Sequence, residues 1–180
     1  MPAYDVRKAV SIIIYADPST VFNAMYHLRL HWSWITMLAY RIRGMKPPSF
    51  FGRKQLKKSM FTMLEVDRER EIILGIIGNF WATTVNARKF EPEEFVTVSF
   101  TGCAKATWNF ELRPISDKKT VLRTETRVLC PGRAAKMKFR LYWFIIQPFS
   151  TLIRKEILKS IKMQAESNRV VKPKYLDSTH

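Results

Sequence analysis

Two histidines have the spacing of metal ligands on a helix. His27 and His31 lie four residues apart, which can place both imidazoles on one helical face. A metal site needs at least a third protein ligand, and no Glu, Asp or Cys lies near the pair in sequence. We therefore expect no metal site and no cofactor here.

The motifs of nucleophilic catalysis and phosphate binding do not occur in the sequence. It has no Gly-x-Ser-x-Gly, no cysteine close to a histidine and no glycine-rich phosphate loop. The carboxylates Glu111 and Glu125 fall on polar positions of alternating segments, so we expect them to be exposed to solvent. Tyr142 and the two histidines are the only candidates for acid–base chemistry. We assign no catalytic residue and expect a protein that binds rather than reacts.

Three successive segments alternate between apolar and polar residues, as antiparallel strands with one buried face do. They span 95–102, 104–113 and 122–128. One face of this sheet is apolar or carries small hydroxyls. Its members are Val96, Val98, Phe100, Ala106, Trp108, Phe110, Leu122, Thr124, Thr126 and Val128. Taken alone, such residues are typical of an ordinary packed core.

A long helical pattern from 134 to about 169 follows the predicted sheet. Its apolar stripe, at spacings of three and four, includes Tyr142, Ile145, Phe149, Leu152 and Ile153. Pro148 is expected to kink or split this helix. Its basic residues either meet an anionic surface or form a soluble outer face, and they are Lys136, Lys138, Arg140, Arg154, Lys155, Lys159 and Lys162.

Earlier segments supply the rest of an α+β arrangement. A strand at 4–15 is followed by Asp17-Pro18, which favours a helix start. Helices are predicted after this cap and at about 30–42. Further strands are predicted at 60–66, 71–77 and 80–90. The order predicts a curved antiparallel sheet of six to seven strands, with two short helices after the first strand and one long C-terminal helix over the concave face.

A basic segment from Arg41 to Lys58 contains no acidic residue. Pro-Pro and Gly predict a loop here, with two phenylalanines near its tip. One interpretation is a solvated charge run. The other is an entrance loop that meets an anionic membrane through Lys46, Phe50, Phe51, Arg53, Lys54, Lys57 and Lys58.

Composition describes one folded, strongly basic domain. The 180 residues carry 31 Lys+Arg against 15 Asp+Glu, a net charge of +16, and 47% are hydrophobic. This length fits one domain, which we place at 4–169, with a disordered tail at 170–180. Two cysteines are expected to be free thiols of a reducing compartment. We therefore expect a cytoplasmic protein whose positive charge attracts an anionic partner.

Several segments resemble a known superfamily. The opening Ala16-Asp17-Pro18-Ser19-Thr20-Val21-Phe22 is similar to the start of the first helix in the START, polyketide-cyclase and birch-pollen-allergen proteins. Blocks at 78–81, 102–110, 124–128 and 139–155 resemble a bacterial branch of that superfamily. The resemblance implies the helix-grip fold and a hydrophobic-ligand pocket, and it implies no catalytic residue.

The expected pocket combines the inward residues of the sheet with the stripe of the long helix. Thr124, Thr126, Tyr142 and Trp108 are its predicted polar anchors. The leading interpretation is non-catalytic binding or transport of a hydrophobic small molecule or lipid. A second is a cyclase or aromatase acting on a polyketide-like substrate, which needs an inward acid–base residue. A third is nucleic-acid binding, which the charge favours but no recognition motif supports.

Overall fold

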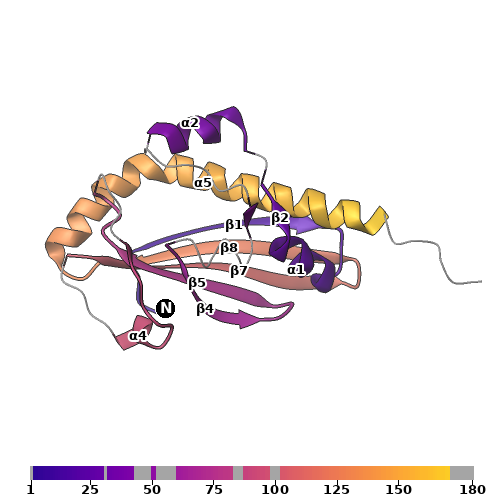
Figure 1. Cartoon of the computed structure of the whole chain (residues 1–180), viewed down its shortest axis with the longest axis horizontal. Helices are drawn as coiled ribbons and strands as arrows, with labels where there is room; N and C mark the ends of the chain where they lie inside the picture. The colour runs from indigo at the N-terminus through magenta and orange to yellow at the C-terminus, as the bar shows by residue number, and fades with distance from the viewer. Residues whose placement is uncertain are drawn as a thin grey trace, which may run out of the picture.

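An antiparallel sheet of six strands forms the framework of the fold (Figure 1). The computed structural model describes residues 2–30, 32–42, 50–51, 60–82, 87–97 and 102–170. The strand order is β1-β8-β7-β5-β4, and β6 also pairs with β5. The strands are β1 (Val6–Ile14), β4 (Thr62–Asp67), β5 (Glu71–Gly78), β6 (Ala87–Arg88), β7 (Ala104–Ser116) and β8 (Lys119–Leu129).

The β7–β8 hairpin is the centre of this sheet, and its register confirms the predicted alternation. Trp108 pairs with Thr126 and Phe110 pairs with Thr124 on the face toward the long helix. Glu111 pairs with Arg123 on the opposite face. One face of the sheet is thus apolar and the other is charged.

Two helices and a small second sheet follow β1. Helix α1 (Pro18–Tyr26) begins at the predicted cap, because the Asp17 carboxylate accepts a 2.9 Å hydrogen bond from the Thr20 backbone N–H. The two-residue strands β2 (Leu28–Arg29) and β3 (Phe50–Phe51) pair with each other. Helix α2 (Trp34–Ile42) lies on the opposite side of the long helix from the main sheet (Figure 1).

Helix α5 (Arg133–Val170) is a single helix of 38 residues that contains Pro148. The predicted split is therefore absent, while the helix bends in its N-terminal part, drawn in orange (Figure 1). The C-terminal half of α5 packs Ile157, Leu158 and Ile161 into the core beside α1 and the sheet. At this end the space between helix and sheet is filled. No helix of the described ranges is long and apolar enough to span a bilayer.

One strand prediction holds only in part, and another was wrong. Of the strand expected at 80–90, only Ala87–Arg88 pairs with a neighbour among the described residues. The strand expected at 95–102 begins instead as the short helix α4 (Glu94–Thr97), and residues 98–101 lie outside the described ranges. Pro92 suits a helix start, and the Glu94 side chain accepts a hydrogen bond from Glu91 N. This local capping outweighs the alternating pattern.

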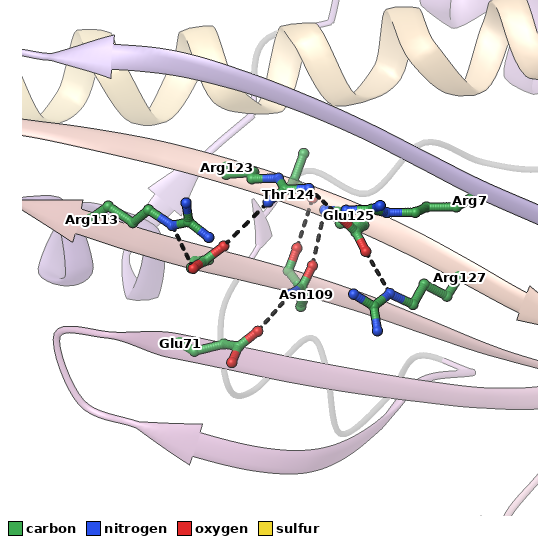
Figure 2. Close-up of polar contacts among 9 residues, drawn as sticks. Arg7, Glu71, Asn109, Arg113, Arg123, Thr124, Glu125 and Arg127 are labelled. Carbon is green, nitrogen blue, oxygen red and sulfur yellow. Dashed lines mark hydrogen bonds and ion pairs between the residues drawn. The ribbon is translucent and has the colours of Figure 1, made fainter. Parts of the chain in front are cut away.

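Glu125 is buried on the charged face of the sheet, which corrects the expectation that it is exposed. It pairs with Arg7 at 2.9 Å and also with Arg123 and Arg127 (Figure 2). Burial alone raises the pKa of the Glu125 carboxyl, but hydrogen bonds and charge from these arginines hold the pKa below its usual value. Arg7 comes from the neighbouring strand β1, while Arg123 and Arg127 lie two residues before and after Glu125 on β8 itself. The pairing of β1 with β8, which brings Arg7 to the carboxylate, is not shown by the sequence pattern.

Candidate functional site

A cavity of about 350 Å³ lies between the sheet and the N-terminal half of α5. Its sheet side is formed by β5, β7 and β8 and by residues just before β4 and just after β5. The described contributors are Met60, Phe61, Ile76, Phe80, Ala106, Trp108, Thr126 and Val128. The inward face of the sheet therefore packs as core beneath one half of α5 and lines a cavity beneath the other.

The helix side of the cavity is a stripe along α5. It runs at helical spacing through Phe139, Tyr142, Trp143, Ile145, Ile146, Phe149, Ser150, Ile153 and Arg154. The Phe139 ring anchors this wall, with ring centroids 5.8 Å from Tyr142 and 5.8 Å from Trp143. Such aromatic packing fixes the shape of the apolar surface offered to a ligand.

The mouth of the cavity lies where lining residues also reach the surface. Ile145 is 59% exposed, and Phe149 and Met60 are exposed as well. Tyr40 of α2 completes the described lining. Helix α2 is tied to α5 at its start, because the Ser33 backbone N–H donates to the Glu156 carboxylate at 3.2 Å and the Ser33 hydroxyl donates to the same group.

The predicted pocket residues divide into three groups. Those that line the cavity are Ala106, Trp108, Thr126, Val128, Tyr142, Ile145, Phe149 and Ile153. Four predicted residues do not line the cavity. Phe110, Leu122 and Thr124 are fully buried in the sheet, and Leu152 is half-buried on α5. Val96 lies in α4 and is 84% exposed, so its inward placement was wrong. Val98 and Phe100 lie outside the described residues.

The predicted entrance loop can be followed only in part. The backbone of Phe50 and Phe51 forms β3 against β2. Lys46, Arg53, Lys54, Lys57 and Lys58 lie outside the described residues, as does His31. The described portion holds no group of three His, Cys, Asp or Glu side chains that could bind a metal ion.

Two of the predicted polar anchors are already engaged with each other. The Trp108 indole N–H donates a 2.6 Å hydrogen bond to the Thr124 hydroxyl oxygen. That hydroxyl in turn donates to the Asn109 backbone carbonyl at 2.9 Å. This chain links β7 to β8. The Trp108 ring packs against Phe61 and Phe110 and forms part of the cavity lining.

Arg154 is a lining residue that the sequence interpretation did not place in the pocket. It was counted among the basic residues of the C-terminal helix, but it lines the cavity and is only 5% exposed. Its guanidinium donates to the Thr126 hydroxyl at 2.8 Å and to the Ser150 carbonyl at 3.4 Å. Burial lowers the pKa of Arg154 to about 10, so it remains a cation at neutral pH.

Comparison with known proteins gives structural matches only. No family model matches the sequence, and no curated protein matches it. The chain superposes on protein MLL2253 of Mesorhizobium loti, with 12% identity, a TM-score of 0.40 and coverage of 90% of this chain and 98% of that one. It also superposes on the Zhui aromatase/cyclase of Streptomyces sp. R1128, with 10% identity, a TM-score of 0.38 and coverage of 93% and 96%.

A third match is the self-sacrificing resistance protein CalC of Micromonospora echinospora, with 13% identity, a TM-score of 0.41 and coverage of 92% and 97%. This chain has the helix-grip fold. Its own strand order and its long helix across the sheet show this directly, as the sequence resemblance predicted. Identities and TM-scores at this level carry no inference about what the chain binds.

Exposed apolar side chains continue outward from the mouth along two helices. On α5 these are Met137, Leu141, Phe144, Ile145 and Phe149, and on α2 they are Trp34, Ile35, Met37 and Leu38. Phe144 is 80% exposed. Scattered apolar residues on a surface need no explanation, but a cluster of large ones marks an interaction site.

Proposed function

We propose that this protein binds a hydrophobic small molecule or lipid in the cavity under α5 and carries it without chemical change. The single observation that supports this most is the cavity itself, with a volume of about 350 Å³ and a mostly apolar lining. Ligand pockets commonly fall in this range of size and character. Apolar surface of this kind is favourable to cover, because each buried methylene of a ligand contributes about 0.8 kcal/mol.

We further propose that the mouth of the cavity meets an anionic membrane. The exposed apolar residues of α2 and α5 would enter the interfacial region, and Phe144 and Leu141 lie next to the lining residues on the same helix. Exposed basic residues flank them, including Lys138 and Arg140. Each cation near an anionic surface contributes about 1 kcal/mol. A ligand could then pass between bilayer and cavity without crossing water.

The cyclase interpretation is less well supported by the cavity. A catalyst of that kind needs an acid–base group facing the substrate. The described lining contains tyrosines and Arg154, and none of its members is a carboxylate or an imidazole. Binding and transport require only the shape and apolar character that the cavity has.

Native mass spectrometry with dodecanol tests the proposed binding. Dodecanol is neutral and apolar, so its retention depends on the cavity rather than on charge. We expect a one-to-one complex that persists in the gas phase, and none with butanol, which has too little apolar surface to be retained. Absence of any dodecanol complex with the folded protein would contradict the proposal.

A further inference from the structure

Arg154 occupies an unusual environment for a charged side chain. Only 5% of it is exposed, and it borders a cavity whose other described lining residues are apolar or neutral. Both of its hydrogen-bond acceptors, the Thr126 hydroxyl and the Ser150 carbonyl, are uncharged. Among the described residues no carboxylate forms an ion pair with it. A buried charge without a partner is costly.

The rest of the described chain pairs its buried charges. Glu125 is buried on the outer face of the sheet and has three arginines around it. The mostly buried Asp5 carboxylate forms an ion pair with Lys136. Arg154 therefore differs from these groups in lacking a counter-charge, and it differs at the position where a ligand would lie.

We propose that the ligand carries an anionic group that binds Arg154. This inference rests on the proposed function and names the class of molecule that the cavity takes, an amphipathic acid with one anionic group on an apolar body. A carboxylate suits the site best, because its two oxygens match the planar fork of a guanidinium. The ligand supplies the counter-ion that the fold omits.

The position of Arg154 also orients the ligand. The exposed lining residues Ile145 and Phe149 lie about two and a half and one and a half helical turns before Arg154 on α5. The mouth is therefore at the N-terminal side and the charge at the buried side. The acid group enters first and reaches Arg154, and the apolar body lies against the aromatic wall and points toward the mouth.

The hydrogen bond to Thr126 fixes the orientation of the Arg154 guanidinium. It holds one N–H of Arg154 against β8, and the Ser150 carbonyl accepts from a second, which leaves the other three of the five guanidinium N–H groups to the ligand. Thr126 is thus a positioning residue in this scheme. Its hydroxyl can also donate to a ligand oxygen, since a hydroxyl both donates and accepts.

Two fluorescent probes that differ only in charge test this inference. N-phenyl-1-naphthylamine and 8-anilinonaphthalene-1-sulfonate share one aromatic skeleton, and only the second carries an anionic group. Titrations at about 0.5 M salt suppress binding of the sulfonate to the basic surface, because the Debye length falls well below 10 Å. We expect the sulfonate to bind at least about tenfold more tightly, as a charge-assisted contact predicts.

Variants on the helix assign that difference to one side chain. Arg154→Met should abolish the preference for the sulfonate, so that the two probes bind this variant with similar affinity. Lys155→Met removes one charge from the next, exposed residue and should change neither affinity. Equal affinity of the two probes for the wild-type protein would overturn the inference, and this comparison needs no variant to fold. A preference for the sulfonate that persists in Arg154→Met would also overturn the inference.

The outcome for the neutral probe separates this inference from the proposed function. If the neutral probe binds and the charged probe binds with no higher affinity, the cavity is a ligand site but Arg154 is not an anion receptor. If neither probe binds the folded wild-type protein, the proposed ligand site itself is contradicted.

Discussion

Arg154 of α5 donates a 2.8 Å hydrogen bond to the Thr126 hydroxyl of β8, and both residues line the cavity. This contact joins the covering helix to the sheet near the boundary between packed core and open space. The sheet positions Thr124 and Thr126 have the same residue type and the same face. The Thr124 hydroxyl accepts a hydrogen bond from the Trp108 indole, and the Thr126 hydroxyl accepts one from the buried guanidinium of Arg154.

Replacing Arg154 by methionine should stabilise the free protein. The substitution removes a buried charge that lacks a counter-ion and leaves an apolar side chain of comparable length. Similar replacements of buried charges raise stability by about 1–4 kcal/mol or leave it unchanged. For a chain of this size, a gain of that order raises Tm by at least about 2 °C, measured by calorimetry without ligand.

Lys155→Met is the matched control for that measurement. Lys155 is exposed, so its loss should change the unfolding free energy by less than about 0.5 kcal/mol. A fall of several degrees in the Tm of Arg154→Met would show that Arg154 stabilises the free fold. It would then need no ligand to explain its burial.

Removing an exposed aromatic residue near the mouth should weaken membrane binding. Phe144→Ser deletes a side chain that is 80% exposed and contributes little to the core. Burying a phenylalanine side chain in an apolar phase is worth about 1.5–3 kcal/mol. We therefore expect about a tenfold or greater loss of affinity for vesicles that contain phosphatidylserine, measured by co-flotation, with no change in Tm.

Met163→Ser controls for the loss of a generic exposed apolar residue. Met163 is 73% exposed and lies in the C-terminal half of the same helix, beyond the cavity. Its replacement should leave vesicle binding unchanged. Equal effects of the two substitutions, or no effect of Phe144→Ser, would remove the mouth from the membrane-binding surface.

The buried ion cluster on the opposite face should make the protein sensitive to acid. The pKa of Glu125 is held below its usual value in the folded state, so the unfolded chain takes up this proton first as pH falls. The stabilisation is complete above the unfolded carboxyl pKa of about 4.3 and is lost as pH falls through the lower, folded value. Urea unfolding from neutral to acidic pH measures this slope.

Glu125→Gln removes the titrating group and should flatten that slope. It should also lower stability at neutral pH, because it leaves the three arginines without their shared carboxylate. Breaking a buried ion pair by removing one partner costs about 3–5 kcal/mol, and the half-exposed arginines of this cluster reduce that figure. A pH slope identical to that of the wild-type protein would exclude Glu125 as its origin.

Local patterns in the sequence predicted much of this fold. The Asp17 cap, the β7–β8 hairpin and the long helix depend on side chains within a few positions of one another. Such local patterns can be recognised in a single sequence. The Glu111–Arg123 pair follows from strand alternation across a tight turn. Helix α4 was missed because Val96 occurs in an alternating run that predicts a strand. The turn and cap before Val96 determine a helical backbone conformation instead.

The candidate site was predicted less completely because burial depends on tertiary packing. Phe110 and Ala106 share one face of one strand, yet Phe110 is core and Ala106 lines the cavity. The helix above them determines this difference. Arg154 did carry a signal, since it continues the i, i+4 series Tyr142, Ile146 and Ser150. A lone arginine on such a stripe is a candidate for a buried, ligand-facing charge.

The central claim is that the space under α5 is a ligand site, and filling it is the most direct test. Ala106 is a small lining residue on β7, and Ala106→Phe projects a ring into the cavity. Ala9→Phe places the same ring on the exposed face of β1 and serves as its control. We predict saturable, one-to-one binding of N-phenyl-1-naphthylamine to the wild-type protein and to Ala9→Phe, and at least about a tenfold weaker affinity for a folded Ala106→Phe. Equal affinity for all three proteins would contradict the account.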